Sequence, residues 1–232
     1  MPRSILRSMK LLIDSADINE IKRLCEYYPI DGVTTNPSIL ASAKRPPFEV
    51  LREIREYIGE RDLHVQTVAD TASGMLADAM RIVGETGKNT FIKIPAVKEG
   101  FKAMKMLSEK GYRVTGTAVY TPLQAYLCAK CGALYVAPYV NRIDNLGYDG
   151  VESVKKMQNI FENHGYETKI LAASFKNSMQ VLELCEYGIG AATLAPSVID
   201  GLVKNEEIEK AVRAFTSDFE SLAGKGRTMS NI

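Results

Sequence analysis

The sequence has no excess of charge of either sign. Its 29 lysine and arginine residues face 28 aspartate and glutamate residues, which gives a formal net charge of +1. A protein that binds nucleic acid or a membrane surface electrostatically needs a basic surplus on one face. We therefore expect no nucleic acid and no membrane among the partners, although a local cationic pocket remains compatible with this balance.

Long apolar runs are also missing. No stretch approaches the ~18 consecutive apolar residues of a membrane-spanning helix. Residues 1–14, MPRSILRSMKLLID, lack the continuous apolar core of a secretory signal. With only four cysteines in the chain, these absences lead us to expect a protein of the reducing cytoplasm.

Metal-binding patterns are scarce. His64 and His164 are isolated, and we expect both to be structural. Cys128 and Cys131 form a CxxC without a second ligand pair, whereas a structural zinc site needs four ligands. We expect no metal and interpret this pair as helical thiols, with a metal or redox role as the alternative.

The chain does contain a regular alternation of strand and helix patterns. Eight short β-favouring runs cover residues 10–14, 32–36, 64–68, 90–95, 113–119, 134–140, 168–174 and 192–196. Amphipathic segments with apolar residues three and four apart lie between them, and a longer one closes the chain at about residues 205–223. This alternation predicts a parallel sheet.

The number and spacing of these units favour a barrel. Eight strand–helix units in 232 residues lie near the compact end of the (β/α)8 range. We predict an α/β protein with a single (β/α)8 TIM-barrel domain over residues 1–232 and an extra C-terminal helix. A doubly wound sheet is the alternative, but the turn after the first strand lacks the GxGxxG pattern.

Polar residues gather where the predicted strands end, which is the face that carries the chemistry in barrels. A packing core would favour Val, Ile or Leu at such positions, so this convergence predicts a site. The polar strand-end residues are Asp14, Thr34, Thr35, Asn36, Gln66, Lys93, Thr115, Thr117, Tyr139, Asn141, Arg142 and Ser174, with Lys176 just beyond.

Lys93 carries the sharpest prediction. Inside an apolar parallel strand its ammonium group would lose hydration, and its pKa would fall toward neutrality. A partly neutral lysine attacks carbonyl groups to give a Schiff base. Asp14, on another strand, is the candidate for moving protons or orienting substrate hydroxyls. The alternatives are a paired structural lysine at 93 and a helix N-cap at Asp14.

Arg142 and Ser174 are candidates for holding a phosphate. Arginine presents a planar fork that matches phosphate oxygens, and the late strands are a frequent phosphate site in barrels. The alternative for Arg142 is a surface pair with Asp144.

Several longer motifs resemble the transaldolase and fructose-6-phosphate aldolase family over nearly the whole chain. They are GVTTNPSIL, FIKIP, TGTAVYTPLQAY, YVAPYVNRID and ILAASFK, in the order and spacing of that family. The resemblance implies a class I aldolase that needs no cofactor and no metal. It also implies a homo-oligomer, a pentamer or decamer, with the C-terminal helix on a neighbouring subunit.

The resemblance extends to individual residues. It implies that Lys93 forms the Schiff base with a ketone donor and that Asp14 assists proton movement. It places Thr34 and Asn36 along the substrate site, and Arg142 and Ser174 at the phosphate of the acceptor.

Three further positions bear on the reaction. By the resemblance, Gln66, Thr117 and Tyr139 hold a catalytic water, and transaldolases proper carry glutamate and phenylalanine in place of Gln66 and Tyr139. We therefore expect fructose 6-phosphate to be cleaved to, or formed from, dihydroxyacetone and glyceraldehyde 3-phosphate. The alternatives are a transaldolase, which transfers the dihydroxyacetone unit between sugar phosphates, and a sugar-phosphate-binding barrel without catalysis.

Overall fold

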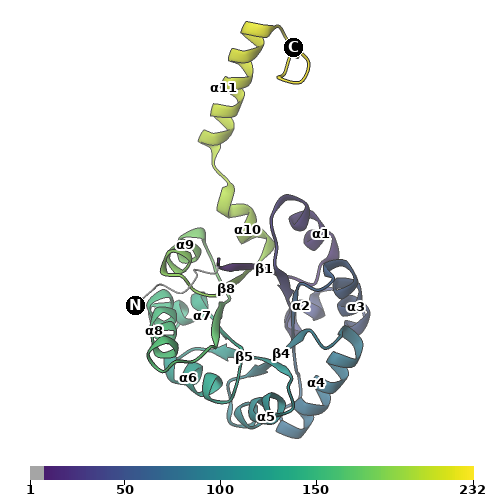
Figure 1. The fold of residues 1–232 in the computed structure, drawn as a ribbon, viewed down its shortest axis with the longest axis vertical. Coiled ribbons are helices and arrows are strands. Elements are labelled where there is room, and N and C mark those ends of the chain that lie inside the picture. Colours follow the sequence, from purple (N-terminus) through teal and green to yellow (C-terminus); the bar gives the residue numbers. More distant parts are fainter. Residues whose placement is uncertain (1–7) are drawn as a thin grey trace. The chain divides into compact units, whose positions relative to one another are not determined.

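The computed structural model describes residues 8–232, in two compact units, one that ends at Ile199 and one that covers Asp200–Ile232. In the first unit, eight parallel strands close into a barrel in the order of the sequence, as the central ring of Figure 1 shows. The strands are β1 (Lys10–Asp14), β2 (Gly32–Thr34), β3 (Asp62–Gln66), β4 (Thr90–Pro95), β5 (Arg113–Val119), β6 (Tyr135–Pro138), β7 (Lys169–Ala172) and β8 (Ala191–Leu194).

In the first unit, helices alternate with these strands and surround them (Figure 1). The helices of the chain are α1 (Ile18–Tyr27), α2 (Pro37–Ser42), α3 (Pro47–Ile58), α4 (Ala72–Thr86), α5 (Lys98–Glu109), α6 (Pro122–Lys130), α7 (Val140–Asn145), α8 (Gly150–Asn163), α9 (Ser178–Tyr187), α10 (Pro196–Val203) and α11 (Glu206–Ala223). The predicted (β/α)8 barrel with a C-terminal helix is confirmed. Among residues 8–232, no helix combines the length and the hydropathy that a bilayer crossing would need.

Five strands differ in their bounds from the sequence prediction. The structure has β2 at Gly32–Thr34 rather than 32–36, β3 at Asp62–Gln66 rather than 64–68, β6 at Tyr135–Pro138 rather than 134–140, β7 at Lys169–Ala172 rather than 168–174, and β8 at Ala191–Leu194 rather than 192–196. β6 ends at Pro138, because the chain turns directly into α7 at Val140. β3 begins at Asp62, so His64 lies inside the strand rather than at its start.

The two faces of each strand are chemically different. Successive strand side chains point to opposite faces. In β4, Ile92 and Ile94 belong to the large apolar core shared with the helices. Phe91 belongs to a smaller cluster with Leu12, Tyr135, Leu171 and Ala191, which fills the inside of the barrel. Lys93 is in phase with Phe91, so its side chain also faces the barrel interior.

The second unit contains α11, whose start follows from its local sequence. Asn205 caps the helix by accepting a hydrogen bond from Glu207 N at 2.9 Å, and three glutamates in the first turn complement the helix dipole. No residue of α11 is buried. Apolar side chains at Ile208, Val212 and Phe215 are exposed.

Candidate active site

The amine of Lys93 is buried inside the barrel. The residue is 4% exposed, and Nζ donates a hydrogen bond to the carbonyl oxygen of Thr35 at 2.8 Å. Burial lowers the pKa of Lys93 below its ordinary value, and the negative charge of Asp14 acts in the opposite direction. On the neighbouring strands Lys93 pairs with Gln66 and with Thr115, so polar side chains flank it on both sides.

Asp14 lies at the end of β1 and takes part in a hydrogen-bonded chain of hydroxyls. Thr34 Oγ1 donates to Asp14 Oδ1 at 2.6 Å and lies 2.7 Å from Thr193 Oγ1. The cap of α1 is Asp17, which accepts from Asn19 N at 2.9 Å, so Asp14 is not the helix cap that the sequence left open. Asp14 also lines a pocket of about 470 Å³ and is therefore accessible to solvent.

Thr117 and Tyr139 come together across β5 and β6. Thr117 Oγ1 and the phenol oxygen of Tyr139 are 3.1 Å apart. Gln66 Oε1 is buried and has no hydrogen-bond partner among the protein atoms of the described residues. Because buried acceptors are rarely left unpaired, this oxygen is suited to a water or a substrate hydroxyl.

Arg142 is placed at the rim by α7 rather than by β6. Its guanidinium lies over the ring of Tyr139 at 4.7 Å from the centroid. The alternative pair with Asp144 is not formed, because Asp144 instead accepts from Gly150 N at 2.7 Å and from Gln180 Nε2 at 2.6 Å. Within residues 8–232, Arg142 has no ion-pair partner, so its charge remains available to a ligand.

Ser174 and Asn36 flank the same rim. Ser174 follows β7 with a left-handed backbone, φ 61°, and its carbonyl accepts from Asn141 N at 2.8 Å, which joins the segments that carry Ser174 and Arg142. Asn36 caps α2, where its Oδ1 accepts from Ile39 N at 3.0 Å. The cap uses this oxygen and leaves the amide NH₂ as a donor.

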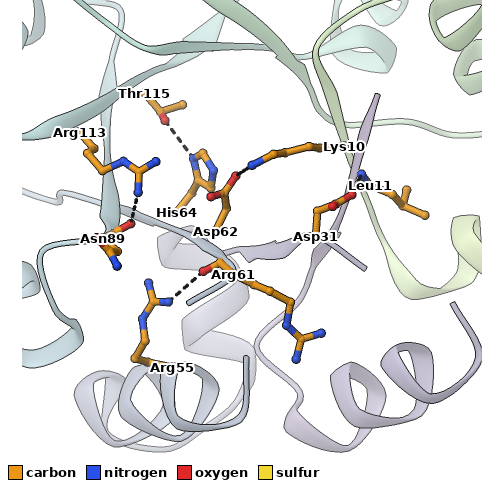
Figure 2. Close-up of polar contacts among 10 residues, drawn as sticks. All are labelled: Lys10, Leu11, Asp31, Arg55, Arg61, Asp62, His64, Asn89, Arg113 and Thr115. Carbon is orange, nitrogen blue, oxygen red and sulfur yellow. Dashed lines mark hydrogen bonds and ion pairs between the residues drawn. The ribbon is translucent and has the colours of Figure 1, made fainter. Parts of the chain in front are cut away.

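The opposite end of the barrel carries a layer of charges that the sequence reasoning did not find (Figure 2). Lys10 of β1 donates to Asp62 of β3, past the intervening strand β2. Arg113 lies over the ring of Phe91 at 4.0 Å and donates to the carbonyl of Asn89 at 3.2 Å. The sequence did contain a signal for the inward direction of Arg113: it lies two and four positions before the inward-facing Thr115 and Thr117, and strand residues two apart share a face.

His64 lies between this charged layer and Lys93. It is fully buried and stacks on Phe91 with centroids 4.3 Å apart. Figure 2 shows its Nδ1 paired with Thr115 Oγ1, at 2.9 Å. Burial, and then the charge of Lys93, lower the pKa of His64 well below its ordinary value. The ring is therefore neutral near pH 7, and it separates the end of the barrel that contains Lys93 from the charged end.

The CxxC pair packs inside the fold. Cys128 is fully buried, and a Cβ added at Gly116 would lie 2.6 Å from its Sγ. Burial raises the pKa of Cys128 to about 12 and also raises the pKa of Cys131. Because the thiolate is the reactive and metal-binding form, these two thiols act as packing groups. Within residues 8–232, no three His, Cys, Asp or Glu side chains are grouped to hold a metal ion.

A closed parallel barrel with polar side chains gathered at the carboxyl ends of its strands is the architecture of a (β/α)8-barrel enzyme. Residues 11–231 match the family model described as transaldolase/fructose-6-phosphate aldolase. The chain belongs to this family.

Two known proteins are similar to this chain. It is 36% identical over 217 residues to a "Probable transaldolase" from Hydrogenobaculum sp., an alignment that covers 94% of this chain and 99% of the relative. It also resembles the crystal structure of inosine 5′-monophosphate dehydrogenase from Legionella pneumophila, with a TM-score of 0.57 at 11% identity. That alignment covers 85% of this chain and 65% of the dehydrogenase chain, and at this identity it shows the shared barrel fold alone.

Proposed function

We propose that this protein is a class I aldolase in which Lys93 forms a Schiff base with a keto sugar. The observation that carries the proposal is the buried amine: one protein hydrogen bond, a lowered pKa, and a barrel interior around it. An amine that loses its proton readily is a nucleophile for a ketone carbonyl.

In the proposed reaction, Lys93 and Asp14 act in turn on the ketose. Lys93 Nζ adds to the C2 carbonyl of the ketose, and loss of water leaves an iminium ion. Asp14 accepts the proton from the C4 hydroxyl as the C3–C4 bond breaks, and the bonding electrons move into the iminium to give an enamine. The aldehyde fragment leaves. Protonation at C3 and addition of water at C2 then release dihydroxyacetone and restore the amine.

Gln66, Thr117 and Tyr139 are suited to manage the water. The unpaired Gln66 Oε1 and the Thr117–Tyr139 hydroxyl pair present an acceptor and two rotatable O–H groups. A phenol at Tyr139 can pass a proton to the enamine through such a water, and a phenylalanine cannot. This supports release of free dihydroxyacetone, the reaction expected from the sequence.

The free guanidinium of Arg142 and the neighbouring Ser174 support a phosphorylated aldehyde, such as glyceraldehyde 3-phosphate, as the other fragment. Thr34 and Asn36 supply hydroxyl and amide groups along the sugar. The substrate class is therefore a sugar phosphate such as fructose 6-phosphate.

A second candidate is transaldolase activity, favoured by the relative named a probable transaldolase. The covalent step is the same, but the enamine attacks a second aldehyde, such as erythrose 4-phosphate, instead of taking a proton. Sequence identity over almost the whole chain supports this candidate, whereas Gln66 and Tyr139 support the aldolase.

Borohydride reduction in the presence of dihydroxyacetone tests the covalent step. We expect a three-carbon mass on the peptide that contains Lys93 and none in Lys93→Met. Lys102→Met, at an exposed position of α5, is the matched control and should keep both the adduct and turnover. Full turnover in Lys93→Met would end this mechanism.

The two reactions are separated on one donor. With fructose 6-phosphate as donor and erythrose 4-phosphate as acceptor, Tyr139→Phe should lower the ratio of free dihydroxyacetone to transfer product. A wild-type protein that releases no free ketone identifies the transaldolase instead.

We further propose that α11 packs on a neighbouring subunit of a homo-oligomer. The support is its amphipathic composition with no buried residue, since an apolar helix face of this kind normally finds a partner.

A further inference from the structure

The carboxyl end of β5 contains one residue more than the strand beside it. Between the paired residues Gly116–Val136 and Val119–Pro138, β5 advances by three positions and β6 by two. The extra residue makes a β-bulge. Ala118, inside the bulge, has a left-handed backbone with φ 53°, a conformation that residues with a Cβ seldom adopt.

The bulge changes which side chains face the barrel interior. In β5, Thr115 and Thr117 face inward, and strict alternation would turn Val119 inward as well. Val119 is instead fully buried in the apolar core shared with the helices. Ala118 is therefore the extra residue of the bulge, and because of it the side chain of Thr117 faces the barrel interior while that of Val119 faces the helices.

The same segment fixes the backbone of Tyr139. Tyr139 N donates to the carbonyl of Val119, the residue directly after the bulge, at 3.1 Å. On its other side, Asn141 N donates to the carbonyl of Ser174 at 2.8 Å, and Ser174 also has a left-handed backbone. Tyr139 thus lies between two kinked strand ends. Left-handed residues other than glycine persist only where the surrounding structure imposes them, and they concentrate at functional sites.

We infer that Ala118 is a positioning residue: its left-handed backbone holds the Thr117 hydroxyl against the Tyr139 phenol and so sets the balance between ketone release and ketone transfer. The inference rests on the proposed function. Release needs a proton at C3 of the enamine, which this hydroxyl pair would deliver. Transfer needs a second aldehyde at C3 instead, with a proton taken up by its oxygen. In both cases the resulting iminium then takes up water at C2, which frees the product and restores the amine of Lys93. Displacing the pair therefore slows release more than transfer.

Two substitutions of comparable size separate backbone conformation from side-chain volume. Valine is β-branched and strongly disfavours the left-handed region, whereas asparagine is enriched there. We expect Ala118→Val to lower the ratio of free dihydroxyacetone to transfer product at least fivefold, and Ala118→Asn to keep it within twofold of wild type. If the valine protein does not fold, Ala118→Leu, unbranched at Cβ, should shift the ratio in the same direction to a smaller extent.

Two further measurements test this role of Ala118. The borohydride adduct at Lys93 should form at the wild-type rate in Ala118→Val. In a Tyr139→Phe background, Ala118→Val should add no further shift of the ratio, because the phenol that it displaces is already gone. Equal shifts in the valine and asparagine variants, or parallel losses of release and transfer, would instead reveal an effect of volume or of folding and overturn the inference.

The outcome also distinguishes this inference from the function on which it rests. If Tyr139→Phe shifts the ratio and Ala118→Val does not, the role proposed for Ala118 is wrong, whereas proton transfer through the Thr117–Tyr139 hydroxyl pair is still supported. If Tyr139→Phe leaves the ratio unchanged, that proton transfer is refuted, and the role of Ala118 is refuted with it.

Discussion

The buried amine of Lys93 should reduce the stability of the fold in a way that depends on pH. The pKa of Lys93 is lower in the folded protein than its ordinary value of 10.5, and desolvation is the main cause. Between these two pKa values the unfolded chain binds the proton and the folded chain does not. The free energy of unfolding must therefore rise with pH in this window, because a rising pH disfavours the unfolded chain, which is the state that binds more protons.

The size of the effect follows from this linkage. Each pH unit inside the window adds about 1.4 kcal/mol to the free energy of unfolding. Below the lowered pKa the full penalty is present, and above 10.5 it vanishes. Lys93→Met replaces the amine with an apolar side chain of similar length and removes the titration. It also removes the hydrogen bond to the carbonyl of Thr35, a loss of about 1 kcal/mol that is independent of pH.

Urea unfolding of the wild type and of Lys93→Met, at equal protein concentration and at half-unit steps from pH 7 to 10.5, measures this difference. We expect the free energy of unfolding of the wild type to increase relative to that of Lys93→Met as pH rises, by up to about 1.4 kcal/mol per pH unit. Lys102→Met removes an exposed charge and should track the wild type throughout. A difference that stays flat across the range, or that changes in the opposite direction, would refute the assignment of a lowered pKa to Lys93.

Four further predictions concern the rest of the molecule. Arg142→Ala should raise KM for phosphorylated aldehydes by about 10–100-fold, the loss of one charge-assisted contact, and should leave KM for unphosphorylated glyceraldehyde unchanged in the same steady-state assay. Gly100→Ala should destabilise the fold by more than about 3 kcal/mol, because the new Cβ would lie 1.9 Å from the carbonyl oxygen of Pro95. Gly84→Ala, with open space around it, should stabilise α4 by about 0.5–1 kcal/mol in the same urea titrations. Removing residues 204–232 should lower the number of subunits per assembly, which light scattering gives once the mass is divided by that of the shortened chain, and an unchanged number would contradict the role of α11 at a subunit interface.

The barrel could be predicted from the sequence because each strand has a local sequence signal. β1, β4 and β5 begin and end at the predicted residues, since apolar, β-branched runs and the helical patterns on either side mark their limits. The inward direction of Lys93 also follows from sequence, once its neighbours Ile92 and Ile94 are assigned to the helix-facing side.

Features that depend on three-dimensional contact could not be read in the same way. The bulge at Ala118 has no local signature, because alanine gives no indication of a left-handed backbone and only the pairing of β5 with β6 reveals it. The end of β6 was placed too late, since Tyr139 and Val140 favour a strand and the turn into α7 is imposed by the neighbouring strand ends. The charged layer at Lys10 and Asp62 needed the barrel closure that brings β1 and β3 near each other.

The alternation of strand faces explains how the fold tolerates a destabilising amine at its centre. Ile92 and Ile94, on either side of Lys93, are fully buried against the helices, where each side chain contributes about 1.5–3 kcal/mol of apolar burial. At the carboxyl ends of the strands the inward positions carry hydroxyls, an amide and the amine, so they contribute little apolar area; the inward apolar residues, such as Phe91 and Leu12, come earlier in their strands. Stability thus comes mainly from one face of the sheet, and the candidate catalytic groups lie on the other. Inward residues such as Gln66 and Tyr139 can therefore change while the barrel that holds them stays folded.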